Sequence, residues 1–507
     1  MTHEVDNDNI YSLFQSKFPE DTWSVFLQHD RGTTTFAQLE KVTAQYSAVL
    51  RAHGLEKGDR VIVQVQNSPE AVLFYLACLR AGAVYIPLNT AYTMAEVEYF
   101  IGDAQPRIVV CDPASESKFI EAFARAGTIE ILTMSDIGTG SVSELARTID
   151  ADFSVANCSR DDLAAILYTS GTTGRSKGAM LTHGNLSSNA MVLHKYWNWE
   201  PGDVLLHALP IFHVHGLFVA LHCALLNGST VVFHKKFDVE MIIMALPEVT
   251  IMMGVPTFYT RLLDNLNFDR KACRNIRLFI AGSAPLLAES FRSFQDRTGH
   301  RILERYGMTE AGMITSNPYE GVRVAGTVGF ALPGVIARVA DKNGDEILRG
   351  ETGVLEITGP NVFAGYWQMP EKTAEEFRDD GFFVTGDMAT MDEGGRISIV
   401  GRSKDLVISG GYNVYPKEVE AVIDEIPGIK ESAIIGVPHQ DFGEAVIATT
   451  VIQDGAEIDA KIVHSHLDGK LAKFKQPKKV FIISELPRNT MGKVQKKILR
   501  EKYADTF

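Results

Sequence analysis

Short apolar runs alternate with helical patterns from residue 60 to beyond residue 281 of this chain. The runs predicted as strands lie at 60–65, 108–111, 204–209, 231–233, 250–254 and 277–281, and a helical pattern follows each of them. Strands joined in this way pair in parallel, and the connecting helices cover both faces of the sheet. The sequence therefore predicts an α/β fold with a large N-terminal domain built on parallel sheets.

The pattern changes twice in the C-terminal part of the chain. Short strands separated by Gly, Pro and Asp, at 353–359 and 382–400, predict a small antiparallel β-barrel or sheet. After 401–405, Gly-Arg-Ser-Lys-Asp, helical and strand patterns are mixed. A short polar connection between two such regions is typical of a hinge, although a tight surface turn has the same composition. We predict an N-terminal domain at 1–402, a hinge at 403–406 that includes Lys404 and Asp405, and a small mobile α+β domain at 407–507.

A loop rich in Gly, Ser and Thr follows the predicted buried strand at 163–167. Backbone N–H groups of such a loop can converge on one anion, glycine lets the chain pass close to it, and hydroxyls and lysine add donors. This composition predicts a polyphosphate cradle, but without the Gly-Lys-Ser/Thr of a Walker loop. A mobile surface linker has a similar composition. The predicted phosphate-binding residues are Thr169, Ser170, Gly171, Thr172, Thr173, Gly174 and Lys177.

Charge and composition limit the partners of the chain. Its net charge of −14 argues against general affinity for nucleic acid, and its apolar stretches are too short to span a membrane. The acidic N-terminus resembles no secretory signal, and five scattered cysteines suit reduced thiols, so we expect a cytoplasmic protein. The segment from Lys470 onward carries eleven Lys and Arg against three acidic residues. This basic surface is either simply solvated or meets an anionic cofactor.

Five further motifs follow one another along the chain. They are Ala-Leu-Pro-Ile-Phe-His-Val-His-Gly at 208–216, Tyr-Gly-Met-Thr-Glu at 306–310, Phe-Phe-Val-Thr-Gly-Asp at 382–387, the run at 401–405 with Gly-Gly-Tyr-Asn at 410–413, and Pro-Arg-Asn-Thr-Met-Gly-Lys at 487–493. In this order, together with the glycine-rich loop, they resemble the adenylate-forming acyl-CoA synthetases, the superfamily of firefly luciferase and nonribosomal-peptide adenylation domains. The resemblance covers nearly the whole chain.

The resemblance implies a reaction in two steps. A carboxylate attacks the α-phosphate of ATP to give an acyl-adenylate and pyrophosphate, and the thiol of CoA then takes the acyl group. It also implies Mg²⁺ as a cofactor, because a hard oxygen ligand such as Glu310 suits that ion. The remaining implied roles are the α-phosphate for Thr309, the ribose for Asp387 with Arg402 beside it, adenine stacking for Tyr306, and transition-state stabilisation for Lys493. Asp387 is expected to end a strand. A lysine near Lys496 and Lys497 could also be an ordinary solvated side chain.

The family's cycle further implies that the small domain rotates about Lys404 and Asp405 between the two steps. Lys493 would serve the first step, and the rotation would then open a channel for the CoA pantetheine while keeping water from the adenylate. The residues expected at CoA are Gly410, Gly411, Tyr412, Lys473, Lys475 and Lys478.

Arg305, directly before Tyr306, indicates the class of acid. A buried arginine needs a partner carboxylate, so the substrate is predicted to carry a second one. Arg261, Ser283 and His213 are further candidates for substrate binding. Each has a plainer interpretation: an ion pair with Glu304 or another acid for Arg305, a helix surface for Arg261, and simple packing for His213 and its neighbour His215.

Several runs, among them Glu-Arg-Tyr-Gly-Met-Thr-Glu at 304–310 and Lys-Phe-Lys-Gln-Pro-Lys-Lys at 473–479, resemble malonyl-CoA synthetases in particular. Malonate is therefore the expected acid, with methylmalonate tolerated. The alternatives are a short-chain or aryl monocarboxylate ligase, an enzyme that loads a carrier protein, and a non-catalytic nucleotide-binding scaffold. The scaffold is disfavoured because Thr169, Glu310, Asp387, Arg402 and Lys493 are all present.

Overall fold

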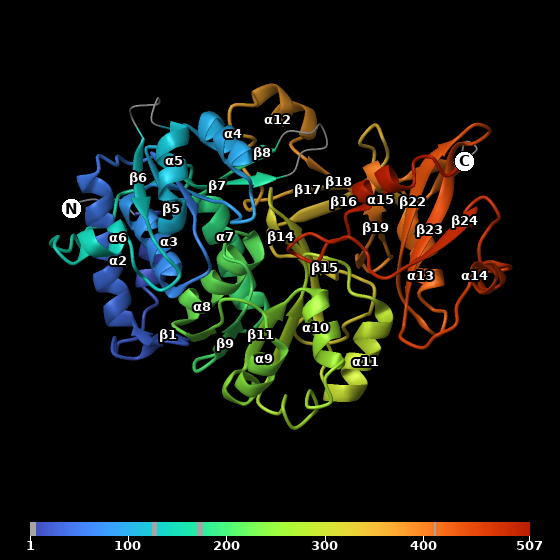
Figure 1. Ribbon diagram of the computed structural model, residues 1–507, viewed down its shortest axis with the longest axis horizontal. Coiled ribbons are helices and arrows are strands. Elements are labelled where there is room, and N and C mark those ends of the chain that lie inside the picture. Colours follow the sequence, from blue (N-terminus) through green and yellow to red (C-terminus); the bar gives the residue numbers. More distant parts are fainter. Residues whose placement is uncertain (1–6, 124–128, 170–175, 410–411) are drawn as a thin grey trace.

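The structure is a computed structural model that describes residues 7–123, 129–169, 176–409 and 412–507. The N-terminal α/β part fills the left and centre of Figure 1, and the C-terminal part lies at the right-hand end. Four sheets form the framework. Two of them are large and belong to the N-terminal part, as the strand-helix alternation predicts.

The first large sheet has six strands in the order β6-β5-β3-β4-β7-β8, all parallel except β8. Its strands are β3 (Arg60–Gln64), β4 (Val84–Pro87), β5 (Ile108–Cys111), β6 (Glu130–Thr133), β7 (Leu163–Thr169) and β8 (Lys177–Thr182). The helices of this region are α1 (Ile10–Gln15), α2 (Phe36–Ala52), α3 (Pro69–Ala81), α4 (Met94–Ala104), η1 (Pro113–Ser115), α5 (Glu116–Phe123) and α6 (Ser141–Ala146).

The second large sheet has nine strands in the order β15-β14-β13-β12-β11-β9-β10-β1-β2. Its central strands are parallel, whereas β2, β14 and β15 pair antiparallel at the two ends. Its strands are β1 (Val25–His29), β2 (Gly32–Thr35), β9 (Val204–His207), β10 (Thr230–Phe233), β11 (Ile251–Gly254), β12 (Leu278–Ala281), β13 (Leu303–Met308), β14 (Gly312–Ser316) and β15 (Phe330–Ala331).

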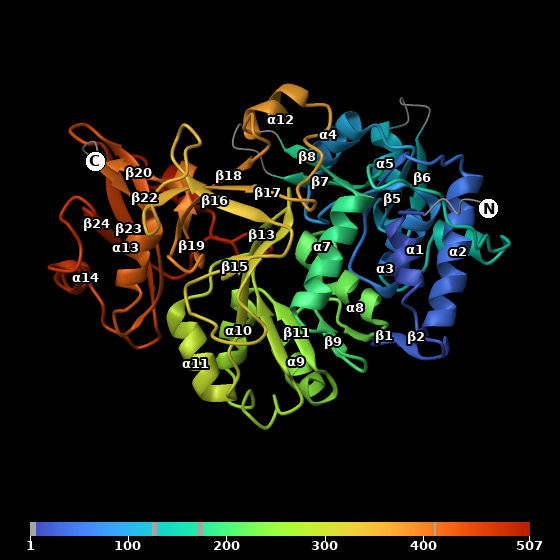
Figure 2. The same ribbon diagram turned by 180° about the vertical axis from the view of Figure 1, so that it is seen from behind.

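Helix α7 (His183–Tyr196) lies between the two large sheets, as both ribbon views show (Figures 1 and 2). It contacts β7 and β8 on one side and β14 on the other. One continuous apolar core runs through this region, and Leu186, Leu193 and Trp197 connect it around the helix. The other helices of the nine-stranded region are η2 (His215–Ala220), which is a π-helix, α8 (Leu221–Asn227), α9 (Val239–Ala245), η3 (Leu246–Glu248), α10 (Pro256–Leu263) and α11 (Ala288–Thr298).

The third sheet is the small antiparallel one that the sequence predicts as a barrel or sheet. It is an open four-stranded sheet in the order β16-β17-β18-β19, so β16 and β19 form its edges rather than closing a barrel. Its elements are β16 (Ile336–Ala340), β17 (Thr352–Thr358), α12 (Pro370–Glu376), β18 (Phe383–Met391), β19 (Ile397–Arg402) and η4 (Ser403–Asp405).

The C-terminal part has its own five-stranded sheet, in the order β21-β20-β23-β22 with β24 parallel to β23. Separate apolar clusters cover its two faces, one including Val419 and Val463 and the other Leu499. Such a core is what a small α+β domain requires. Its elements are β20 (Val407–Ser409), β21 (Tyr412–Val414), α13 (Pro416–Ile423), β22 (Ile429–His439), β23 (Gly443–Ile452), α14 (Ala460–Leu467), β24 (Lys479–Ile483) and α15 (Lys496–Lys502).

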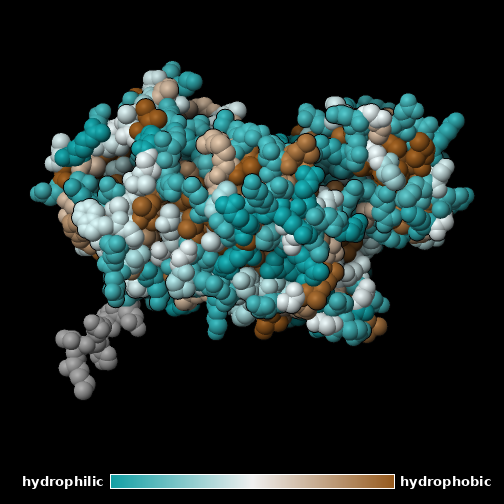
Figure 3. All heavy atoms as spheres, turned by 90° about the horizontal axis from the view of Figure 1, so that it is seen from below, coloured by the Kyte–Doolittle hydropathy of each residue, from teal (hydrophilic) through white to brown (hydrophobic). Residues whose placement is uncertain are grey.

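The surface seen from below is mostly hydrophilic, and its hydrophobic residues lie in small separate groups (Figure 3). Among the described residues, no helix combines the length and the apolar character that a membrane crossing requires.

Candidate active site

The hairpin of β13 and β14 brings three predicted nucleotide-site residues to one end of the nine-stranded sheet. Tyr306 lies on β13, and Thr309 and Glu310 form the turn before β14. The turn is tight: a Cβ atom at Gly307 would lie 2.1 Å from the carbonyl oxygen of Gly312. Glycine is therefore required where the two strands approach each other.

Asp387 links this hairpin to the four-stranded sheet. The Tyr306 hydroxyl donates to its Oδ2 at 2.5 Å, and Nε of Arg402 lies 3.0 Å from its Oδ1. Arg402 is held there because β18 and β19 pair it with Asp387. The sequence suggested that Asp387 ends a strand, which is wrong: it lies inside β18. Tyr306, Asp387 and Arg402 thus form one polar group in which Asp387 is buried and the other two side chains are partly exposed, as a nucleotide site would need.

Strands β7 and β8 fix the two ends of the glycine-rich loop. Thr169 and Lys177 face each other across this pair, whereas Ser170, Gly171, Thr172, Thr173 and Gly174 lie outside the described residues. Lys177 is buried, with Nζ 3.3 Å from Oε1 of Glu376 and 4.1 Å from the centre of the Tyr366 ring. The sequence missed β8, because its first residues belong to the polar loop.

Glu310 is the residue predicted to hold Mg²⁺, and Tyr366 connects it with Lys177. Its Oε1 accepts a hydrogen bond from the Tyr366 hydroxyl at 3.1 Å. Burial raises the pKa of Glu310, and the charges of Lys177 and Arg402 oppose that rise. The described residues contain no group of three or more His, Cys, Asp or Glu side chains that could hold an ion. One carboxylate fits Mg²⁺ that arrives with a polyphosphate, because this ion takes most of its ligands from phosphates and water.

Arg305 lies on β13 beside this nucleotide group and is 2 % exposed. Its Nε and Nη2 atoms have no hydrogen-bond partner, and among the described residues no carboxylate forms an ion pair with it. Burial lowers the pKa of its guanidinium to about 9. A buried arginine without an acid is costly, so this cation is ready to receive an anion from outside the chain.

Glu304 does not supply that anion. Successive side chains of a strand point to opposite faces of the sheet. The Oε1 atom of Glu304 accepts from the backbone N–H of Leu286 at 3.1 Å, and burial raises the pKa of this carboxyl to about 7. The alternative that Arg305 serves as the ion partner of Glu304 is therefore wrong.

The charge of Arg305 acts on two histidines, and a serine contacts one of them. The pKa of His213 falls to about 4 because it is buried and because Lys493 and Arg305 are positively charged. Burial and the charge of Arg305 also lower the pKa of His215. Nδ1 of His215 lies 3.3 Å from Oγ of Ser283, which has the unusual backbone angle φ +71°. Neutral imidazoles beside a cation leave its charge free for a substrate.

The sequence favours simple packing for His215, which the motif at 208–216 contains. Its position at the start of the π-helix η2 is the missing signal, since π-turns are common at functional sites.

Arg261 differs from the other substrate-binding candidates in its exposure to solvent. It is exposed on α10 and has no ion pair among the described residues, so its substrate role stays a prediction.

Lys493 reaches this region from the C-terminal part. Its loop is a compact turn, in which the Asn489 side chain accepts from the backbone N–H groups of Met491 and Lys493 at 3.0 and 2.9 Å. The loop touches α10, because a Cβ atom at Gly492 would lie 2.9 Å from Oγ1 of Thr257. Lys493 is solvent-exposed as a residue, although protein atoms surround the end of its side chain.

Electrostatics place Lys493 between the nucleotide group and the acyl candidates. Its enclosure and the nearby charge of Arg402 lower the pKa of its ammonium to about 8, while Asp387 acts in the opposite direction. The same ammonium lowers the pKa of His213. The charge of one lysine therefore acts on both the predicted ribose site and the predicted acid site.

The hinge residues lie in η4, between β19 and β20. Asp405 forms an ion pair with Arg500 of α15, and Lys404 is exposed. Among the predicted CoA residues, Gly410 and Gly411 are outside the described residues. Tyr412 is 59 % exposed and stacks on Phe474 with ring centres 4.6 Å apart.

The three predicted CoA lysines are not gathered at the active site. Lys475 pairs with Glu418 at 2.6 Å, Nζ of Lys478 lies 4.0 Å from the centre of the Phe442 ring, and Lys473 is exposed. Their role in holding CoA stays a prediction for another domain arrangement.

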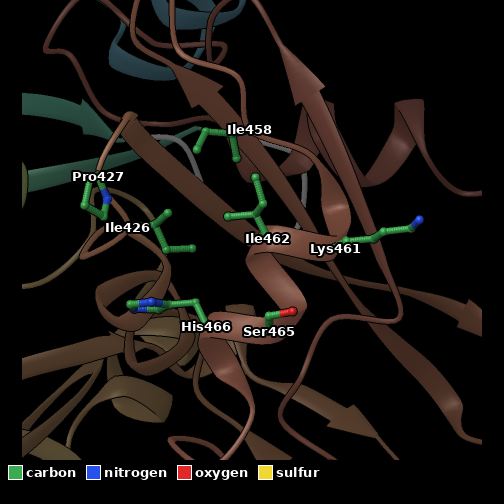
Figure 4. A pocket seen from close by; sticks show the side chains of 7 residues that line it. All are labelled: Ile426, Pro427, Ile458, Lys461, Ile462, Ser465 and His466. Atoms are coloured by element: carbon green, nitrogen blue, oxygen red, sulfur yellow. The ribbon is translucent and has the colours of Figure 1, made fainter.

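Of two surface cavities, one lies away from this group of residues and one borders it. Figure 4 shows one of about 540 Å³ beside α14, where Ile426, Ile458 and Ile462 point into an apolar hollow. It contains no predicted site residue. A second cavity, of about 510 Å³, lies beside α12 and includes Tyr366, the residue that links Lys177 to Glu310.

Comparison with known proteins shows the family to which this chain belongs. A family model described as AMP-binding enzyme matches residues 14–367. A second, described as AMP-binding enzyme C-terminal domain, matches residues 418–493. The chain therefore belongs to the AMP-binding enzymes, which confirms the resemblance drawn from its motifs.

Individual proteins similar to this chain include CoA ligases that are named for different acids. The malonate–CoA ligase ACSF3 of Mus musculus is 35 % identical and aligns with 90 % of this chain and 84 % of its own length. A feruloyl-CoA synthase of Amycolatopsis is 34 % identical, over 94 % of this chain and 95 % of its own. Among solved structures, ATP-bound MatB from Rhodopseudomonas palustris is 52 % identical over 99 % of each chain, with a TM-score of 0.96. The apo form of the same protein superimposes with a TM-score of 0.86.

Proposed function

We propose that this protein is an AMP-forming acid–thiol ligase that converts malonate, ATP and CoA into malonyl-CoA, AMP and pyrophosphate through a malonyl-adenylate. The observation that carries the proposal is the buried guanidinium of Arg305, which has no acid partner among the described residues. A substrate with a second carboxylate would supply that partner. A monocarboxylate would leave the cation unpaired in a buried site, which disfavours its binding.

The proposed first step joins the two halves of the site. Arg305 would hold the distal carboxylate, with Ser283, His213 and Arg261 as the other predicted substrate-binding residues. The near carboxylate would attack the α-phosphate. Thr309 and Lys177 would hold phosphate oxygens, and Asp387 with Arg402 would fix the ribose. Lys493 would stabilise negative charge where the two reactants meet. Bound with ATP, Mg²⁺ would neutralise phosphate charge, and Glu310 is the side chain that would hold it.

Solved relatives support the proposal that the structure has the arrangement for this first step. The TM-score is higher to ATP-bound MatB than to its apo form at the same sequence identity. The contact of Gly492 with Thr257 and the charge effect of Lys493 on His213 agree with it. We propose that the second step needs rotation about Lys404 and Asp405, which would withdraw Lys493 and bring the Tyr412 segment to the CoA pantetheine.

A monocarboxylate ligase is the second candidate, because the relatives include a feruloyl-CoA synthase of similar identity. An aryl acid would need an apolar pocket, and Arg305 argues against one. The name of the mouse malonate–CoA ligase places that protein in mitochondria, and the cytoplasmic location of the present chain stays a prediction.

Pyrophosphate release separates the candidates. The purified protein is assayed with malonate, methylmalonate, acetate, benzoate and octanoate, each with and without CoA. The proposal expects turnover with malonate, and with methylmalonate to a lesser degree, and AMP accumulation that depends on CoA. Turnover with benzoate or octanoate above malonate would favour the monocarboxylate ligase. Turnover that does not depend on CoA but requires a phosphopantetheinylated carrier protein would favour an enzyme that loads a carrier protein.

A further inference from the structure

Gly282 lies directly against the Arg305 guanidinium. It follows β12, whose last paired residue, Ala281, faces Glu304 in the parallel strand β13. The next residues along the two strands are Gly282 and Arg305. A Cβ atom at Gly282 would lie 2.4 Å from Cζ of Arg305, 2.5 Å from Nη1 and 2.6 Å from Nε. All three nearest atoms belong to the guanidinium.

The backbone does not require glycine at this position. Gly282 is absent from the residues of the described chain that have positive φ, so an alanine could adopt its conformation. The reason for glycine is therefore space. An ordinary van der Waals contact needs at least 3.4 Å, so a methyl group here would displace the guanidinium by about 1 Å.

The surroundings offer the guanidinium little alternative space. Nε and Nη2 of Arg305 are already enclosed by other atoms without a hydrogen bond. Ser283, directly after Gly282, is held at φ +71° with its Oγ toward His215. The missing side chain at Gly282 thus defines where the cation lies.

We propose that Gly282 is a specificity-determining residue: its lack of a side chain keeps the Arg305 guanidinium at the position that receives the distal carboxylate of a diacid. This inference rests on the proposed function and deepens it. Gly282 is a positioning residue, because it acts through Arg305 and needs no contact with the substrate. A misplacement of about 1 Å in a binding group can cost about a hundredfold in rate.

The test is Gly282→Ala, measured as the ratio of kcat/KM for malonate to kcat/KM for acetate. We expect this ratio to fall at least about tenfold, and toward a hundredfold, while KM for ATP stays near that of the wild type. Gly102→Ala is the matched control. It is a glycine-to-alanine change at a φ that is not left-handed, in α4, and nothing lies within 4 Å of the added Cβ. It should leave the ratio unchanged.

A double-mutant cycle with Arg305→Ala separates this role from a structural one. Once the guanidinium is gone, Gly282→Ala should change the ratio by less than about twofold, because the added methyl group then has nothing to displace. An effect of Gly282→Ala that persists undiminished in the Arg305→Ala background would overturn the proposal. Should Gly282→Ala fail to fold alone, the double variant should fold again; if it does not, the clash is not with Arg305 and the inference is wrong.

The ratio of kcat/KM for malonate to that for acetate in the wild-type enzyme distinguishes failure of this inference from failure of the proposed function. A wild-type enzyme without preference for malonate over acetate would refute the proposed function. A wild type that prefers malonate, with the same preference in Gly282→Ala, would refute only the role of Gly282.

Discussion

Replacing Arg305 with methionine should make the nucleotide-free protein more stable while removing its preference for a diacid. Burial lowers the pKa of this guanidinium from the usual 12.5 to about 9, which corresponds to a cost on the order of 5 kcal/mol for keeping it charged. Its side chain is 2 % exposed and has no ion pair among the described residues. Exchanging such buried charge for a hydrophobic side chain of similar length stabilises proteins by about 1–4 kcal/mol. We expect a gain in that range.

The same substitution should weaken the selectivity for malonate by a free energy similar in size to the gain in stability. Removing one partner of a buried charge pair costs about 2–5 kcal/mol, which is about 30-fold to 5,000-fold in the ratio of kcat/KM for malonate to that for acetate. Two assays decide the outcome: urea unfolding of the nucleotide-free protein, and steady-state pyrophosphate release with both acids.

Arg277→Met is the matched control, because Arg277 is a partly buried arginine with an acid partner. Its Nε lies 2.7 Å from Oδ1 of Asp203, which is 3 % exposed. Breaking that pair should destabilise the protein by about 3–5 kcal/mol and leave the acid preference unchanged. If Arg305→Met destabilised the protein as Arg277→Met does, and kept the preference for malonate, the assignment of Arg305 to the substrate would be refuted.

Two further predictions concern Lys493. Lys493→Ala should slow formation of the adenylate by about 10²- to 10³-fold, measured as malonate-dependent ATP–pyrophosphate exchange. Transfer from preformed malonyl-adenylate to CoA should stay within about threefold of the wild-type rate. Equal losses in both steps would contradict the role of Lys493. The pH profile supplies a second test, because the pKa of Lys493 is about 8 and only the protonated ammonium stabilises negative charge. The exchange rate should be level below that pH and fall as pH rises through it, whereas thiol transfer should show no such fall; an exchange rate that rises through this range would show that the neutral amine is required.

The sequence predicted the parallel strands well, because buried β-branched runs such as those at 60–64 and 108–111 carry a strong periodic signal. It missed β8, whose pairing with β7 gives structure to Lys177 and the residues that follow it. Local composition there is that of a loop, and only the tertiary pairing makes it a strand. The position of Asp387 inside β18 was missed for the same reason, since its neighbour Gly386 suggests the end of a strand.

Only those site residues that belong to recognisable motifs could be predicted from the sequence. Tyr306, Asp387 and Arg402 were expected together, and the structure joins them. The sequence could not decide whether Arg305 pairs with Glu304, because that depends on the opposite faces of β13 and on the N–H of Leu286. Nor could it place His215 in the site or find Gly282, because their positions depend on the π-turn at η2 and on the register of β12 with β13.

The fate of the malonate oxygens tests the central claim most directly. Malonate labelled with heavy oxygen in both carboxylates is converted in the presence of ATP and CoA, and the products are analysed by mass spectrometry. If the near carboxylate attacks the α-phosphate, one labelled oxygen passes to AMP and the remaining three stay in malonyl-CoA. Unlabelled AMP with the fourth labelled oxygen in water, or label that appears in inorganic phosphate with ADP as the nucleotide product, would contradict the account.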